Sequence, residues 1–148
     1  NLTLVGDGPL QDSIKDLVSS YGLNNHVLFL GIRKDVNLIL REHKYFVLPS
    51  LYEGNPMSVL EAMSSGLPII ASKTGGISDV INAPDNGFLF PVNSMDDFVK
   101  HMVYLVDNPA ISQKISEDNI IEAKKHDIMH NAKQHYNLFA RHIAKTKN

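Results

Sequence analysis

Two glutamates in the segment LYEGNPMSVLE (residues 51–61) have the side chains and the spacing to hold a ligand rich in hydroxyl groups. Glu53 and Glu61 are separated by seven residues, which begin with Gly54, Asn55 and Pro56. A carboxylate accepts hydrogen bonds from two hydroxyl groups at once, which suits a vicinal diol. The simpler alternative is that Glu53 is a solvated loop charge and Glu61 an exposed helix residue.

The residues between the glutamates predict a helix whose N-terminus binds an anion. Asn55 is a favourable N-cap, and Pro56 suits the first helical position because its missing N–H is not needed there. The next backbone amides then have no partner within the helix. Together with the helix dipole they form a site suited to phosphate, and they belong to Met57, Ser58 and Val59.

The positions of the two glutamates relative to this phosphate site indicate a ligand with three parts. Glu53 comes just before the site, and Gly54 lets the loop approach a ligand closely because it has no Cβ. Glu61 lies five residues past Pro56, which is about 7–8 Å along a helix axis at ~1.5 Å per residue. One diol-binding carboxylate on each side of a phosphate site fits a ligand of the form sugar–diphosphate–ribose.

The composition bounds the class of protein. The chain has 148 residues, 43% of them hydrophobic and 20% charged, with a formal net charge of −2. This is ordinary globular composition, and it does not predict binding to nucleic acid. There is no cysteine, and no apolar run reaches the roughly 18 residues of a membrane span. We therefore expect a cytoplasmic protein, and the strand-like start without Met indicates a fragment of a larger one.

Apolar runs alternate with helical segments along the first 92 residues. This alternation predicts an α/β fold, a Rossmann-like parallel sheet with helices on both faces. Strands are expected at 2–5, 26–31, 45–50, 67–72 and 87–92. Helices are expected between them and in a C-terminal helical segment, 109–148, preceded by a helix at 95–106; the segment itself divides into 109–125 and 128–145. In such sheets ligands bind beyond the carboxyl ends of the strands. The loops expected at that edge are 6–9, 31–33, 49–55 and 74–76.

The segment EGNPMSVLEAMSSGLPIIAS (residues 53–72) resembles the Glu–seven residues–Glu signature of the group 1 retaining glycosyltransferases (family 4). The flanking segments LVGDGPL, NHVLFLG, DVNLIL, FVLPS and NGFLFPV agree with that family, as does the Gly-Gly pair before a short helix. The resemblance runs collinearly over about residues 1–106. It implies that residues 1–148 are one nucleotide-sugar-binding domain, the C-terminal, donor-binding half of a GT-B enzyme.

The resemblance implies a role for each candidate residue. Glu53 binds hydroxyls of the transferred sugar near its anomeric face, and Glu61 binds the ribose hydroxyls. The remaining implied positions are Gly54, Asn55, Pro56, Met57 and Ser58 for the diphosphate and sugar, Gly6 and Gly8 for the other wall of the cleft, and Ile32 and Arg33 for the base.

The implied chemistry is transfer of a sugar from a nucleotide-diphosphate sugar to a glycan, lipid or other acceptor, as in cell-envelope polysaccharide synthesis. It proceeds with retention of configuration and requires no bound metal or other cofactor. The family's phosphate-binding Arg and Lys lie upstream of Leu2, and the N-terminal acceptor-binding domain is missing, so we expect the chain alone not to turn over. Asp79 stands where the family often has Glu.

Two other classes of protein remain open. One is a GT-B relative with different chemistry, such as a nucleotide-sugar epimerase or a phosphorylase. The other is a non-catalytic nucleotide-sugar-binding domain.

Histidines and lysines near the C-terminus have simple interpretations. His126 and His130 have a spacing that can bind zinc, but no third ligand is placed, which favours a polar helix face. The basic residues of the last segment fit a solvated face and leave open a peripheral contact with anionic lipid at the inner face of a membrane. They are Lys124, Lys125, Lys133, Arg141, Lys145 and Lys147.

Overall fold

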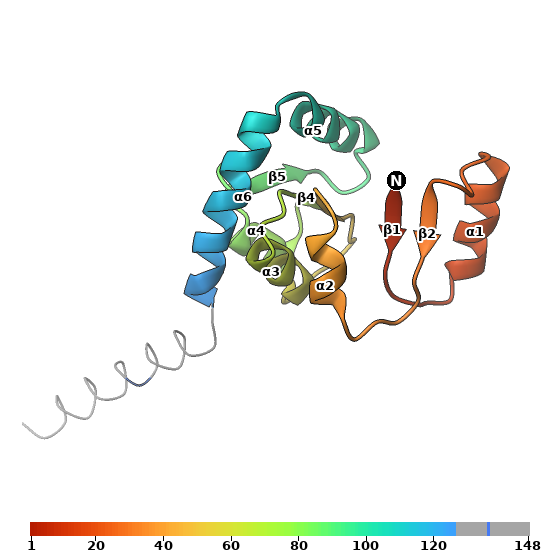
Figure 1. Ribbon diagram of the computed structural model, residues 1–148, viewed down its shortest axis with the longest axis horizontal. Coiled ribbons are helices and arrows are strands. Elements are labelled where there is room, and N and C mark those ends of the chain that lie inside the picture. The colour runs from red at the N-terminus through yellow and green to blue at the C-terminus, as the bar shows by residue number, and fades with distance from the viewer. Residues whose placement is uncertain (127–135, 137–148) are drawn as a thin grey trace, which may run out of the picture. The chain divides into compact units, whose positions relative to one another are not determined.

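The protein is seen here as a computed structural model that describes residues 1–126 and Tyr136 (Figure 1). Strands and helices alternate as predicted through β5. The elements are β1 Leu2–Leu4, α1 Gln11–Ser20, β2 Val27–Phe29, α2 Val36–Arg41, β3 Phe46–Leu48, α3 Met57–Ser64, β4 Ile69–Ser72, α4 Gly75–Val80 and β5 Gly87–Phe90. They are followed by α5 Met95–Asp107, α6 Pro109–Ala123 and a 3₁₀ turn, η1 Lys124–His126. The helix predicted at 128–145 lies outside the described residues.

All strand pairs in the described part of the chain are parallel, as predicted. β1 pairs with β2, and β4 lies between β3 and β5 in a second sheet. Parallel pairing places the carboxyl ends of β3, β4 and β5 at one edge of their sheet. The loops that follow Leu48, Ser72 and Phe90 therefore leave from the same edge.

The chain divides into two compact units, Asn1–Ile39 and the part from Leu40 onward. The first unit has little interior. Its helix α1 contains no buried residue, and Leu17 on that helix is 55% exposed. None of the buried hydrophobic residues in the described part of the chain lies within this unit.

The second unit has a well-formed core around β4. All four residues of β4 are buried, and because side chains alternate between the faces of a strand, both faces of the sheet are covered. On one face, Ile70 packs in a cluster with Phe90 of β5, Leu105 of α5 and Ile115 of α6. Val59, Ala62 and Met63 are the buried residues of α3.

The turn from α3 into β4 is attached closely to α6. Gly66 has a φ of +76°, and it ends α3 with two hydrogen bonds, from its own N–H to Met63 O (2.9 Å) and from Leu67 N–H to Ala62 O (3.0 Å). This is a Schellman motif, for which glycine is preferred. The amide of Asn119, which is fully buried on α6, donates to Leu67 O at 2.8 Å. α6 therefore supports the strand that carries Ser72.

Asn119 is predicted to contribute to the stability of the second unit. In Asn119→Ala the carbonyl of Leu67 loses its buried partner, so we expect the free energy of unfolding to fall by about 1–3 kcal/mol. Gln113→Ala is the control on the same helix, because the side chain of Gln113 is exposed and bonds to Glu117 at the surface, and it should change stability by less than about 0.5 kcal/mol. Chemical denaturation measures both, and equal effects would contradict the prediction.

Candidate functional site

Glu53 lies in the loop between β3 and α3, at the carboxyl edge of the second sheet. Its side chain is half-buried, and its Oε1 accepts a hydrogen bond from the hydroxyl of Ser50 at 3.1 Å. For the other carboxylate oxygen, the described residues provide no hydrogen bond. One oxygen is therefore held by the protein and the other is available to a ligand.

The loop that carries Glu53 is hydrogen-bonded to the last residue of β4. Ser72, the last residue of β4, is 1% exposed. Its hydroxyl donates to the backbone carbonyl of Ser50 and lies 3.4 Å from that of Leu48. A buried hydroxyl that bonds to a neighbouring strand end restricts the direction in which the loop leaves the sheet.

The turn after β4 also fixes the Glu53 loop, through its two glycines. Gly76 N–H donates to the carbonyl of Glu53 at 3.0 Å. A Cβ on Gly75 would come within 2.7 Å of the same carbonyl oxygen, and a Cβ on Gly76 would overlap that of Gly54. The sequence predicted that the loop 74–76 lies at the ligand-binding edge and that Gly54 lets a ligand approach closely. For this pair the neighbour is instead the protein's own backbone, whereas a Cβ on Gly54 would meet nothing within 4 Å.

The start of α3 differs from the prediction. Pro56, and not Asn55, is the N-cap, and no side chain caps the helix. With φ −79° and ψ 68° at Pro56, Met57 N–H donates to Asn55 O at 2.9 Å, which is the geometry of an inverse γ-turn. Because a γ-turn precedes the first helical turn, the amide of Met57 is not available to an anion.

A second amide of the expected anion site is also engaged. Val59 N–H donates to Pro56 O at 2.9 Å. Among the three amides, that of Ser58 has no hydrogen bond to any described residue. The prediction of three unpartnered amides was therefore wrong for two of them, and α3 offers an anion one backbone donor in this conformation.

Glu61 lies on the solvent side of α3. Its side chain is exposed, while Val59, Ala62 and Met63 form the buried side. Its backbone carbonyl accepts hydrogen bonds from the hydroxyls of Ser64 and Ser65. Because the side chain is exposed, its carboxylate is accessible. The predicted contact with a ribose stays a prediction.

The glycines predicted in the first unit lie at the carboxyl end of β1. Gly6, with a φ of +123°, donates its N–H to Gly31 O at 2.8 Å. Gly8 N–H donates to the carboxylate of Asp7 at 2.7 Å. A Cβ at either glycine would meet nothing within 4 Å, so the backbone there is open to a ligand.

Ile32 and Arg33 follow β2 and are exposed, but Arg33 is already paired. Ile32 is 80% exposed. Arg33 holds Asp35 in a two-point contact, with Nε to Oδ1 at 2.8 Å and Nη2 to Oδ2 at 2.6 Å. The hydrogen bond from Arg33 is the main cause that lowers the pKa of Asp35. A ligand that uses this guanidinium must compete with Asp35.

A pocket of about 390 Å³ opens at the carboxyl ends of β3, β4 and β5. Two of the residues that line this pocket also lie next to the surroundings of Glu53. Ser72, at the end of β4, bonds to Ser50, and Leu51 belongs to the loop that carries Glu53. We did not predict this pocket, although the apolar residues that follow β3 and β5, such as Leu51 and Val92, are a signal for it. The apolar residues that line it include Val47, Pro49, Leu51, Phe90, Val92 and Phe98.

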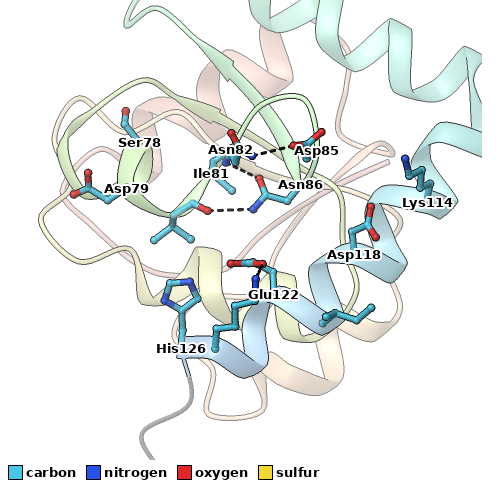
Figure 2. A pocket seen from close by; sticks show the side chains of 13 residues that line it. Ser78, Asp79, Ile81, Asn82, Asp85, Asn86, Lys114, Asp118, Glu122 and His126 are labelled. Atoms are coloured by element: carbon cyan, nitrogen blue, oxygen red, sulfur yellow. Dashed lines mark hydrogen bonds and ion pairs between the residues drawn. The ribbon is translucent and has the colours of Figure 1, made fainter. Parts of the chain in front are cut away.

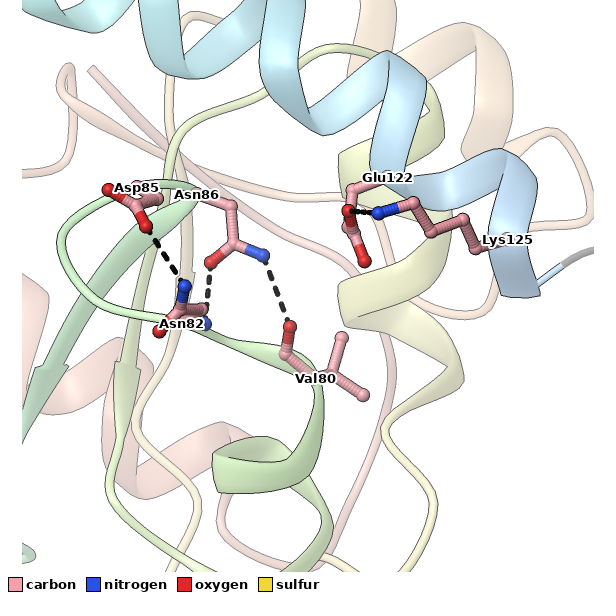
Figure 3. Close-up of polar contacts among 6 residues, drawn as sticks. All are labelled: Val80, Asn82, Asp85, Asn86, Glu122 and Lys125. Carbon is pink, nitrogen blue, oxygen red and sulfur yellow. Dashed lines mark hydrogen bonds and ion pairs between the residues drawn. The ribbon is translucent and has the colours of Figure 1, made fainter.

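A larger pocket of about 760 Å³ lies at the opposite edge of this sheet, where Asn86 directly precedes β5 (Figure 2). Its polar atoms are largely paired. Asn86 is 5% exposed, accepts from Asn82 N–H at 2.7 Å and donates to Val80 O at 3.1 Å (Figure 3). Asp79 also lines it. Size alone therefore does not identify the functional site, because Glu53 belongs to the other edge.

No group of three His, Asp or Glu side chains that could hold a metal ion occurs within the part of the chain that the structure describes. His130, which was considered with His126, lies outside that part.

The chain matches the family described as "Glycosyl transferases group 1" over residues 1–127. It therefore belongs to this family of glycosyltransferases. The match covers the loop with Glu53, the helix with Glu61 and the loops that follow β1 and β2.

Named relatives span several bacterial species. The chain is 37% identical over 110 residues to UDP-Gal:alpha-D-GlcNAc-diphosphoundecaprenol alpha-1,3-galactosyltransferase of Escherichia coli, covering 74% of this chain and 28% of the relative. It is 33% identical over 116 residues to N-acetyl-alpha-D-glucosaminyl L-malate synthase of Bacillus anthracis, covering 78% and 30%. The chain thus spans about a third or less of these relatives.

Solved structures show the same fold. Anabaena HepE in complex with UDP superposes with a TM-score of 0.84 at 25% identity, covering 94% of this chain and 40% of HepE. A variant of Staphylococcus aureus TarM in a complex that includes UDP gives a TM-score of 0.83 at 26% identity, covering 93% and 28%. The predicted fold is confirmed: an α/β domain with a parallel sheet that corresponds to the C-terminal half of GT-B glycosyltransferases.

The close contact between the Gly75–Gly76 turn and the loop that carries Glu53 predicts different effects on stability for substitutions at Gly76 and at Gly54. In Gly76→Ala the new methyl group overlaps the carbonyl of Gly54, and we expect a loss of about 1–3 kcal/mol in the free energy of unfolding. In Gly54→Ala the methyl group points into open space, and stability should change by less than about 0.5 kcal/mol. Denaturant titration of the two variants measures both changes in the free energy of unfolding. A Gly76→Ala protein as stable as the unsubstituted one would show that the contact does not constrain the loop.

Proposed function

We propose that this chain is the donor-binding domain of a retaining glycosyltransferase that moves a sugar from a nucleotide-diphosphate sugar to an acceptor. The observation that carries the proposal is Glu53, which is held at the carboxyl edge with one carboxylate oxygen bonded to Ser50 and the other available. A sugar hydroxyl is a suitable donor for that oxygen. Membership of the family supports the reaction class, and the complexes of HepE and TarM support a UDP-linked donor.

In this proposal the two glutamates divide the donor between them. Glu53 contacts the transferred sugar near the reacting carbon, where a negative charge stabilises the positive character that develops in the transition state. Glu61, exposed on α3, binds the ribose hydroxyls. The backbone from Gly54 to Ser58 meets the diphosphate. The roles expected for Gly6, Gly8, Ile32 and Arg33 of the first unit, in contact with the donor and its base, stay predictions.

The diphosphate requires more positive partners than the start of α3 supplies. The leaving diphosphate gains negative charge as the glycosidic bond breaks, and the start of α3 offers it the single unpartnered amide of Ser58. We therefore infer that cationic side chains and the acceptor site belong to a part of the enzyme outside residues 1–148. The chain alone is expected to bind the donor weakly and to catalyse no transfer.

The names of two relatives bear on the acceptor. The E. coli relative is named for a diphosphoundecaprenol-linked acceptor and the B. anthracis relative for L-malate. Because such different acceptors accompany similar domains, we infer that this half selects the donor and leaves the acceptor to the other half.

Among the described residues, no helix combines the length and the apolar character of a membrane span. A cytoplasmic enzyme that meets a cell-envelope acceptor at the inner face of the membrane stays part of the proposal.

Glu61→Ala is predicted to weaken binding of the nucleotide. Loss of the charged acceptor for the ribose hydroxyls should reduce the affinity for UDP by about 1–3 kcal/mol. Glu117→Ala removes an exposed carboxylate on α6 and serves as the control for net charge. Ligand-observed NMR on residues 1–148, or calorimetry on the longer enzyme, measures the change. If Glu61→Ala binds UDP as tightly as the control, the assignment of the ribose is wrong.

Glu53→Gln in the full-length enzyme is predicted to reduce turnover more than nucleotide affinity. Removing one preorganised charge near the reacting carbon should lower kcat by roughly 10²-fold, while the affinity for UDP stays within about twofold because UDP has no transferred sugar. Steady-state kinetics beside calorimetry tests both. A lower UDP affinity with an intact kcat would mean that the roles of the two glutamates are exchanged. An epimerase or a binding domain would give no transfer product with the unsubstituted protein.

A further inference from the structure

The hydroxyl of Ser50 is the direct protein contact of the Glu53 carboxylate. It donates to Oε1 at 3.1 Å across a separation of three residues, in a partly buried position. Ser50 itself is held from the other side, because its backbone carbonyl accepts a hydrogen bond from the buried hydroxyl of Ser72. The contacts therefore run from the end of β4, through Ser50, to the carboxylate.

Glu53 is also fixed at its backbone, which makes the side-chain contact decisive for orientation. Its carbonyl accepts the N–H of Gly76 at 3.0 Å, so its Cα cannot move freely with the loop. The side chain still has three rotatable bonds and can adopt many orientations. A hydrogen bond to one carboxylate oxygen selects among them and determines where the second oxygen points.

We propose that Ser50 is a positioning residue for Glu53. Its hydroxyl holds Oε1 so that the second oxygen faces the sugar of the bound donor, and Ser72 holds Ser50 in place. This inference rests on the proposed function, because it assigns Ser50 a role through the charge of Glu53. Ser50 itself touches neither the sugar nor the nucleotide in this proposal.

The alternative is that the Ser50 hydroxyl only stabilises the loop. The two roles predict different couplings to Glu53. A hydroxyl that orients the carboxylate matters for turnover only while the charge is present. A hydroxyl that only stabilises the loop contributes the same factor whether residue 53 is charged or not, and the two substitutions would then be additive.

The test compares Ser50→Thr with Ser50→Val in the full-length enzyme. The two replacements have nearly the same shape and differ in the hydroxyl, so the added methyl group cancels in their ratio. We expect kcat of Ser50→Thr to exceed that of Ser50→Val by about tenfold, which is the effect of one hydrogen bond to a charged group. Both variants should bind UDP within about twofold of the unsubstituted enzyme.

The same pair is then measured in combination with Glu53→Gln, where the ratio of kcat values should fall to within about twofold. Ser112→Ala is the control for a lost hydroxyl, because the hydroxyl of Ser112 donates to the backbone carbonyl of Leu105 on α5 at 2.7 Å. It should leave kcat unchanged even where it lowers stability.

The outcomes separate this inference from the proposed function. Equal kcat values for Ser50→Thr and Ser50→Val, or the same ratio with and without Glu53→Gln, would overturn the positioning role while leaving Glu53 in place. If Glu53→Gln itself keeps full turnover, the role proposed for the charge of Glu53 is wrong, and the positioning role of Ser50 is wrong with it.

Discussion

The close contact between the Gly75–Gly76 turn and the loop that carries Glu53 is the constraint on which the site depends. The turn donates one N–H to the carbonyl of Glu53, and neither glycine has room for a Cβ. With Ser72 bonded to Ser50, the loop is held by β4 and by the start of α4. Both attachments use backbone or buried groups, so the loop conformation comes from the fold and does not require the donor.

The start of α3 determines what this domain can and cannot supply. A hydrogen bond to a charged group contributes about 1.5–3 kcal/mol. The γ-turn at Pro56 and the bond from Val59 N–H remove two of three expected donors, so under the proposed function several kcal/mol of diphosphate binding comes from groups other than these amides. On the proposed function, the domain therefore contributes more to binding the sugar and the ribose than to stabilising the leaving group. That division agrees with a chain that spans a third or less of its named relatives.

The sequence was sufficient for the positions of the strands along the chain, for their parallel pairing and for the edge at which Glu53 lies. Buried parallel strands such as β4 appear as short apolar runs, and their carboxyl ends follow from the alternation with helices. It was not sufficient for Asn55, because capping preferences do not include the ψ of Pro56 that closes a γ-turn. The sequence also shows that Gly75 and Gly76 lack a Cβ, but not whether a ligand or the backbone of Gly54 fills that space. Ser50 escaped notice because its partner is a side chain three residues away in an irregular loop.

The central claim is that the donor binds at the carboxyl edge of the sheet, against a loop that is already ordered. The most direct measurement is amide chemical-shift mapping of residues 1–148 during titration with a UDP-sugar. We expect the largest changes at Gly54 and Ser58, with the amide of Gly76 protected from hydrogen exchange before the ligand is added. We expect no change at Asn82 and Asn86, in the larger pocket at the opposite edge. Changes centred on Asn82 and Asn86, with none at Gly54 and Ser58, would show that the donor binds elsewhere.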